Sequence, residues 1–131
     1  MTVVDASVLV SALIDSGRRG VWARSQLRKG PFAAPHLITA EATHALRGAQ
    51  LNKRLSSEIA NLAFADLLRT PVELYPFHPF AERIWQLRDT LTVYDAWYVA
   101  LAEALGVPMA TLDERLANAP GPNCHFHTPR A

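Results

Sequence analysis

The chain of 131 residues has the length of one ordinary domain, and its 50% hydrophobic residues are enough to bury a core. This composition, with only 19% charged residues, excludes an intrinsically disordered protein. Thirteen Lys and Arg oppose twelve Asp and Glu, so the net charge of +1 excludes a globally basic nucleic-acid-binding protein and leaves only local patches for such a contact.

The first half of the chain alternates short apolar runs with longer segments of helical periodicity. The short runs are rich in β-branched or small residues and predict buried strands, whereas the longer segments begin at residues that cap helices. We expect strands at 3–4 and 32–34, and helices at 8–14 (with Ser7 as the N-cap), 18–29, 36–50 and 56–69. The last of these helices carries an apolar stripe: Ile59, Leu62, Ala63, Phe64, Leu67 and Leu68.

The second half continues the alternation of strands and helices. We expect strands at 72–75, 108–112 and 124–126, and helices at 76–87 and 93–105. The helix at 93–105 ends at Gly106 and carries an apolar face with i, i+4, i+7, i+11 spacing: Tyr94, Tyr98, Leu101 and Leu105. This order of elements indicates an α/β fold, a single domain over 1–131 with a central, mostly parallel sheet flanked by helices on both faces.

Cysteine usage and the absence of targeting segments indicate the cytoplasm. Cys124 is the only cysteine, which excludes an internal disulfide and a cysteine-based zinc site. The first residues lack the basic region of a signal peptide, and no apolar run reaches the about 18 residues that suggest a membrane span. We therefore expect a cytoplasmic protein without a membrane contact.

Four carboxylates occupy apolar surroundings. Asp5 is the only charged residue in positions 1–14, Glu41 the only one between positions 29 and 47, and Asp95 the only one between positions 89 and 103. Asp113 ends the apolar run that follows position 103. A lone acid in an apolar run has to be neutralised, paired or bound to a cation, because burying an unpaired charge is costly.

The predicted elements bring these acids toward one place. Asp5 and Asp113 follow strands, and open parallel sheets place their ligand crevice beyond the carboxyl ends of the strands. Asp95 falls in the first turn of its helix, and Glu41 lies partway along another. Four converging carboxylates repel unless a cation neutralises them, and ligation by oxygen alone indicates Mg²⁺ or Mn²⁺.

Each acid also has a purely structural interpretation. Asp95 can interact favourably with the dipole of its helix, and Glu41 can pair with a neighbour on its own helix. Asp5 and Asp113 can cap the helices that follow them. Four such coincidences at strand ends and helix starts favour one shared site.

The order of these motifs resembles the PIN-domain family, and within it the VapC-type toxins of bacterial toxin–antitoxin pairs. The resemblance covers essentially the whole chain, and its most specific part is the run Tyr-Asp-Ala-Trp-Tyr-Val-Ala-Leu-Ala at 94–102. The other matching segments are Val-Val-Asp-Ala-Ser-Val-Leu at 3–9, Glu41 in a helix that ends Leu46-Arg47, and Thr-Leu-Asp at 111–113.

This resemblance implies a Mg²⁺- or Mn²⁺-dependent endoribonuclease that cleaves RNA with metal-activated water. Asp5 and Asp95 match the principal metal ligands, and Glu41 and Asp113 complete a catalytic acidic quartet that also holds the metal. Two hydroxyl groups match positions that support the acids by hydrogen bonding: Ser7 and Thr111.

The partners that the resemblance implies are RNA and a cognate VapB-type antitoxin that blocks the site. A homodimer is expected from the same resemblance and from the high apolar fraction. The basic helix at 18–29 can hold RNA phosphates or be a solvated face, and its candidate residues are Arg18, Arg19, Arg24 and Arg28. Lys53 and Arg54 have the same two interpretations in a loop.

Two other classes remain as alternatives. A non-catalytic PIN scaffold would bind RNA or protein without cleaving it, although all four acids are intact. A phospho-receiver would need adjacent acids near the first strand and a Lys after a late strand, but the only lysines are Lys29 and Lys53. A phosphatase of the haloacid type would need an acid where Ser7 stands, so both of these acidic α/β domains are disfavoured.

Overall fold

The computed structural model describes residues 1–129, and at their centre five short parallel strands form one sheet. Its order is β3–β2–β1–β4–β5. The strands are β1 (Thr2–Val4), β2 (Phe32–Pro35), β3 (Glu73–Tyr75), β4 (Met109–Ala110) and β5 (Phe126–His127). The connections reverse direction between β1 and β4, where Val4 pairs with Ala110, and such a switch point forms a crevice beyond the strand ends.

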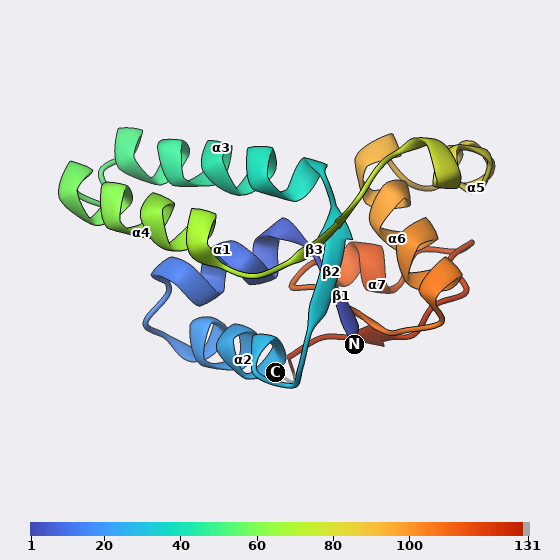
Figure 1. Ribbon diagram of the computed structural model, residues 1–131, viewed down its shortest axis with the longest axis horizontal. Coiled ribbons are helices and arrows are strands. Elements are labelled where there is room, and N and C mark those ends of the chain that lie inside the picture. The colour runs from blue at the N-terminus through green and yellow to red at the C-terminus, as the bar shows by residue number, and fades with distance from the viewer. Residues whose placement is uncertain (130–131) are drawn as a thin grey trace.

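Helices cover both faces of the sheet. In Figure 1, α1 (Ala6–Ile14), α2 (Arg18–Leu27), α3 (Leu37–Leu51) and α4 (Ser57–Arg69) gather on one side of the strands, and α5 (Ala81–Gln86) and α6 (Val93–Leu105) on the other. A 3₁₀ helix, η1 (His78–Phe80), precedes α5, and α7 (Glu114–Ala117) follows β4. Right-handed crossovers explain the division, because the chain moves outward from β1 to β3 and then returns across the sheet to β4. None of the helices within 1–129 combines the length and the hydropathy of a membrane span.

Helix α6 builds both the core and one side of the crevice. Its small residues Ala96, Ala100 and Ala102 are buried, so the helix packs closely on the sheet. Because a crossover helix runs back against the strand direction, its first turn lies at the edge where the strands end. Tyr98 is buried, but Tyr94 in that first turn is 59% exposed. The predicted apolar face is therefore wrong at Tyr94, which extends past the sheet.

The predicted fold class is confirmed, and α6 has the predicted bounds 93–105. Several element bounds differ from the prediction: the strand expected at 108–112 is only β4 (Met109–Ala110), the helix expected at 76–87 is η1 followed by α5, and the helix expected at 18–29 ends at Leu27. Helix α1 begins at Ala6 with Asp5, not Ser7, as its N-cap, because the Asp5 carboxylate accepts a hydrogen bond from the backbone of Val8. Strand β5 covers Phe126–His127 in place of 124–126, because these residues pair with both residues of β4.

Helix α4 leaves much of its apolar stripe outside the core. Its buried residues are Ala60, Ala63 and Leu67, whereas Leu62 and Leu68 are 63% and 61% exposed. The predicted stripe is thus only partly correct, because α4 packs against α3 and α1 through a narrower face than the sequence suggests.

Candidate active site

Asp5 directly follows β1 and lies at the crevice between β1 and β4. It is 8% exposed, and its Oδ1 accepts hydrogen bonds from Ser7 Oγ at 2.5 Å and from the backbone nitrogen of Val8 at 3.1 Å. Its Oδ2 accepts a third hydrogen bond, from the hydroxyl of Thr111. Burial raises the pKa of Asp5 although these hydrogen bonds favour the ionised form. Asp5 is therefore a buried carboxylate held in a fixed orientation.

Ser7 and Thr111 connect the two loops that carry Asp5 and Asp113. Ser7 Oγ accepts a hydrogen bond from the backbone nitrogen of Leu112 at 3.2 Å, and Thr111 Oγ1 accepts one from that of Asp113 at 3.0 Å. Each hydroxyl thus donates to Asp5 and accepts from the loop after β4. These contacts hold the ends of β1 and β4 in one arrangement.

Glu41 lies on the second turn of α3, just after β2 ends. The buried hydroxyl of Tyr98 on α6 donates a hydrogen bond of 2.6 Å to Glu41 Oε1, so the two faces of the sheet meet at this contact. Burial raises the pKa of Glu41, and the hydrogen bond from Tyr98 opposes that shift. The pKa of Tyr98 is raised far above its ordinary value by burial and by the same contact. Tyr98 is therefore a neutral donor at every physiological pH.

Asp95 and Asp113 border the crevice from α6 and α7. The backbone nitrogen of Asp95 donates to the N-cap hydroxyl of Thr92 at 3.1 Å, and a side-chain hydrogen bond with Thr92 partly opposes the raised pKa of the Asp95 carboxyl. Asp113 caps α7, because its Oδ1 accepts from the backbone of Arg115 at 3.0 Å and of Leu116 at 3.3 Å. The capping interpretation is correct for Asp113, and its Oδ2 accepts no bond from the described residues.

The four acids lie close enough for their charges to interact. Burial is the largest cause of the raised pKa of Asp5, Glu41 and Asp95, and the charge of a neighbouring acid raises each of them further. Asp95 acts on Asp5 and Glu41, and Asp113 acts on Asp95. None of the four forms a salt bridge within the described part of the chain. The fold thus brings all four predicted acids to one edge of the sheet, and none of them is in salt-bridge contact with a basic residue of the described part.

A cavity of about 430 Å³ opens between α1 and α3 beside these acids. Ser7, Glu41, Leu112 and Asp113 line it, and one cation, Arg19 of α2, borders it. The cavity therefore offers a negative interior with a single positive residue at its margin.

The chemistry of the four acids fits a hard divalent cation. Carboxylate oxygens are ligands that Mg²⁺ and Mn²⁺ accept, and unpaired neighbouring carboxylates gain from a cation between them. Within residues 1–129, no three His, Cys, Asp or Glu side chains form a group that could hold a metal ion as they stand. The fit therefore rests on the donor atoms, on their mutual repulsion and on the oxygens left without a hydrogen bond.

The four arginines of the predicted basic helix have different surroundings. Arg24 Nη1 donates to the carbonyl oxygens of Ala12 at 3.2 Å and Asp15 at 2.8 Å, at the end of α1. Its guanidinium thus joins α2 to α1, whereas an RNA contact of Arg24 stays a prediction. Exposed positions remain for three of the predicted residues: Arg18, Arg19 and Arg28.

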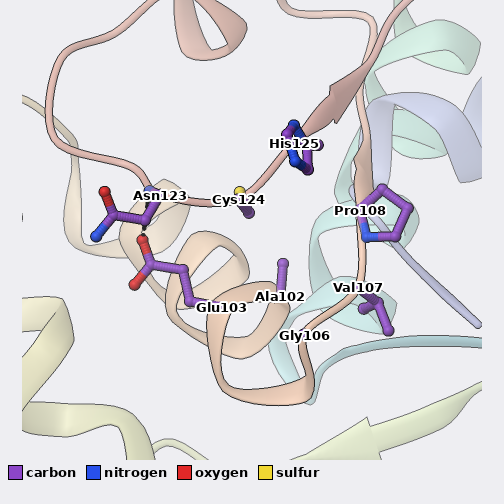
Figure 2. Close-up of a pocket in the computed structure, with 8 residues that line it drawn as sticks. All are labelled: Ala102, Glu103, Gly106, Val107, Pro108, Asn123, Cys124 and His125. Carbon is purple, nitrogen blue, oxygen red and sulfur yellow. Dashed lines mark hydrogen bonds between the residues drawn. The ribbon is translucent and has the colours of Figure 1, made fainter.

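A second cavity, of about 340 Å³, lies at the opposite edge of the sheet, where β4 begins (Figure 2). Glu103 lines it, and two contacts fix its carboxylate. Arg83 Nε donates to Glu103 Oε1 at 2.7 Å, and the backbone nitrogen of Asn123 donates to Oε2 at 2.7 Å. Burial raises the pKa of the Cys124 thiol to about 11, so the thiol is protonated at neutral pH. This cavity contains none of the four acids and no activated nucleophile.

The PIN-domain family model matches residues 2–122. Over 125 residues the chain is 46% identical to ribonuclease VapC1 of Mycobacterium tuberculosis, and the match covers 95% of this chain and 94% of VapC1. The chain belongs to the PIN-domain family. Its identity to VapC1 further makes it a VapC-type PIN domain, as the sequence resemblance predicted.

Two solved structures have the fold of this PIN domain. VapC20 of Mycobacterium tuberculosis, a sarcin–ricin-loop-cleaving toxin, aligns with a TM-score of 0.66 at 18% identity, over 88% of this chain and 92% of that one. A toxin–antitoxin complex from Klebsiella pneumoniae aligns with a TM-score of 0.63 at 22% identity, over 99% of this chain and 98% of that one. At these identities the likeness shows the fold.

The four acids of this PIN domain are predictable from the sequence, but the role of Tyr98 is not. The residue was assigned to an apolar face, and its ring is indeed buried there. The available signal was its position three residues after Asp95, on the buried side of the same helix turn, because a buried tyrosine hydroxyl needs a polar partner. The sequence gives no indication that this partner is Glu41.

Proposed function

We propose that this VapC-type PIN domain is a divalent-metal-dependent endoribonuclease, the toxin of a type II toxin–antitoxin pair. The observation that carries the proposal is the set of four interacting carboxylates, Asp5, Glu41, Asp95 and Asp113, which have no salt bridge in residues 1–129. The 46% identity to a protein named ribonuclease VapC1 supports RNA as the substrate.

In this proposal Asp5 and Asp95 hold a Mg²⁺ or Mn²⁺ ion, and Glu41 and Asp113 complete the ligand set. When bound, the ion supplies a Lewis acid and lowers the pKa of a water molecule. Asp5 needs no reorganisation, because three hydrogen bonds already fix its carboxylate.

Glu41 Oε2 is the oxygen best placed to complete the ligand set in this proposal. Its Oε1 is occupied by the Tyr98 hydroxyl, and within the described residues Oε2 accepts no hydrogen bond. Burial raises the pKa of Glu41, so its ionised carboxylate would gain from a neighbouring cation.

We also infer the partners that accompany this activity. One PIN domain over 1–131, acting in the cytoplasm, would pair with a VapB-type antitoxin and form a homodimer. A toxin–antitoxin complex among the structural neighbours and the exposed apolar residues of α4, such as Leu62 and Leu68, support partner binding. Light scattering on the purified chain, alone and with the product of an adjacent small gene, measures both associations.

Cleavage of RNA by the purified protein tests the proposal. Wild type should cleave total RNA with Mg²⁺ or Mn²⁺ and fail to do so with EDTA. Asp5→Asn should lower the cleavage rate by about 100-fold or more, because it removes a principal electrostatic contributor. Asp66→Asn is the matched control, since Asp66 is an exposed acid that pairs with Arg69 on α4.

Asp95→Asn accompanies these variants because Asp5 also caps α1, and circular dichroism verifies that each variant is folded. Full cleavage by Asp5→Asn and Asp95→Asn, or by wild type in EDTA, contradicts the proposal. RNA binding by wild type without cleavage in either metal would instead support the non-catalytic PIN scaffold.

A further inference from the structure

The acidic cavity continues into a groove along α1. Glu41 and Asp113 line the cavity of about 430 Å³, and a cavity of about 300 Å³ lies next to it. The two cavities share three lining residues: Val10, Ser11 and Ala45. The two cavities therefore form one groove between α1 and α3, called here the α1–α3 groove. Its far end reaches Arg54 and Leu55, in the loop between α3 and α4.

Each section of the α1–α3 groove is bordered by one arginine. Arg19 borders the section with the acids, and Arg54 borders the far section. Neither forms a salt bridge within residues 1–129. The loop of Arg54 is fixed, because its backbone nitrogen donates to the carbonyl of Ala49 at 2.9 Å and its Nε donates to Asn52 Oδ1 at 3.2 Å. The remaining guanidinium nitrogens of Arg54 are free to bind an anion.

The far section of the groove is lined by one acid, Asp15, whose carboxylate already accepts a hydrogen bond. Its Oδ1 accepts a hydrogen bond of 2.7 Å from the backbone nitrogen of Gly17, at the turn between α1 and α2. Its contact with that turn leaves Arg54 as the charged group best able to bind a ligand in the far section. Apart from its charged residues, the groove is lined by small or apolar side chains and by three serines: Ser7, Ser11 and Ser16.

The other arginines of α2 do not border the groove. Arg24 is bound to carbonyl oxygens of α1, Arg28 lines a different cavity beside β2 and β3, and Arg18 lines none of the cavities described here. The groove therefore separates Arg19 and Arg54 from their basic neighbours, a distinction that charge counting along the sequence cannot make.

We propose that the α1–α3 groove holds the backbone of single-stranded RNA, with Arg19 on a phosphate beside the acidic cluster and Arg54 on a phosphate further along the strand. Cavities of this size each hold a small ligand, about one nucleotide, so a duplex does not fit. Arginine is suited to the task because its planar guanidinium binds phosphate oxygens in pairs. This inference rests on the proposed function, because it takes RNA as the substrate.

RNA binding in EDTA tests the groove without cleavage. Fluorescence anisotropy of a labelled single-stranded RNA of about ten nucleotides, titrated with the full chain at several salt concentrations, gives the affinity and its salt dependence. Arg19→Ala and Arg54→Ala should each weaken binding by about threefold or more and lower the salt slope by about 0.7, the value for one lost phosphate contact on a single strand. The double variant should lower the slope by about 1.4.

Arg18→Ala and Arg28→Ala are the matched controls, because they remove the same charge from α2 outside the groove. We expect both to keep the affinity and the salt slope of wild type. Equal losses in the controls would overturn the groove in favour of a general effect of charge, and so would tight binding of a duplex of the same sequence. Unchanged binding by the Arg19 and Arg54 variants would also overturn it.

The two proposals fail in different experiments. If wild type binds the single strand through Arg19 and Arg54 but never cleaves RNA in Mn²⁺, the proposed function fails and the groove stands. If wild type cleaves RNA while both arginine variants bind with the affinity of wild type, the groove fails and the proposed function stands.

Discussion

At the scale of single residues, the hydrogen bond from Tyr98 to Glu41 makes a specific prediction. Tyr98→Phe keeps the buried ring but removes the donor that holds Glu41 Oε1. Because loss of a group that orients a metal ligand typically costs about 10–100-fold in metal affinity, we expect the variant to need correspondingly more Mn²⁺ for half-maximal RNA cleavage. Mn²⁺ titration by calorimetry and by cleavage rate measures the change.

The matched control for this change lies on the same helix. Tyr94→Phe removes an identical hydroxyl from an exposed tyrosine, and we expect it to leave the Mn²⁺ requirement unchanged. A Tyr98→Phe protein that is folded and has the Mn²⁺ requirement of wild type would rule out the positioning role.

The residues that sequence reasoning found and those it missed differ in a physical way. Asp5, Glu41 and Asp95 are visible in the sequence because each is a lone charge among apolar neighbours. The contact of Tyr98 with Glu41 and that of Arg24 with the end of α1 depend on which helices meet, which the chain order alone does not specify. Lone acids can thus be read from the residues themselves, whereas the neutral partners Ser7 and Thr111 follow only from the family resemblance and Tyr98 follows from neither.

At the scale of elements, the corner between α1 and α2 depends on a glycine. A Cβ on Gly20 would lie 1.7 Å from the carbonyl oxygen of Asp15 and 3.0 Å from Arg24 Nη1. Backbone atoms cannot yield at such a distance, so Gly20→Ala has to push α2 away from α1. We expect a loss of about 1–3 kcal/mol in the free energy of unfolding, measured by urea denaturation, as is typical of overpacking.

Gly48→Ala provides the control for that loss. Gly48 lies inside α3, and a Cβ there meets no atom within 4 Å. We expect a gain of about 0.5–1 kcal/mol, because alanine is the better residue in a helix. Since Arg19 precedes Gly20, displacement of α2 should also weaken RNA binding in Gly20→Ala. Equal stability of the two variants would show that the corner tolerates the extra methyl group.

Most elements were predictable because their signals are local. Helix α6 has a capping threonine at its start and Gly106 at its end, in the left-handed conformation that glycine favours, so both bounds follow from the sequence. Strand β5 has no such signal, because its two residues are defined only by pairing with β4. The N-cap of α1 was misplaced because Asp5 and Ser7 are both good capping residues.

At the scale of the whole molecule, burial and repulsion of the acids in the site should make the stability of the fold depend on pH. Asp5, Glu41 and Asp95 have a pKa raised above the ordinary value in the folded chain, first by burial. Below its pKa in the unfolded chain, which is near 4, such an acid is protonated in both states and does not lower the free energy of unfolding. As pH rises from there through the folded pKa, the native state has to ionise against burial and its neighbours and loses stability.

The metal-free protein should therefore unfold at a lower temperature at pH 8 than at pH 5.5. The pKa of Glu103 is shifted in the opposite direction, because the contact with Arg83 lowers it. The stability that this contact contributes changes only below about pH 4.5, outside the range from pH 5.5 to pH 8. Mg²⁺ or Mn²⁺ should restore the stability lost at pH 8, because a cation that binds only the native state stabilises it. Melting curves in EDTA and in Mn²⁺ at both values of pH measure the effect.

Asp95→Asn determines whether this charge belongs to one cluster. The change removes a charge that acts on Asp5 and Glu41, while the Thr92 cap, which binds the backbone nitrogen of Asp95, stays intact. In EDTA at pH 8 the variant should melt no lower than wild type, and Mn²⁺ should stabilise it less.

Glu58→Gln is the matched control, because Glu58 lies in the first turn of α4 behind the Ser56 cap and is remote from the site. Neutralising this ordinary helix-terminal acid should lower the free energy of unfolding by about 0.3–1 kcal/mol and leave the response to Mn²⁺ unchanged. If Asp95→Asn behaves as Glu58→Gln does, Asp95 acts only on its own helix and the four acids do not form one site.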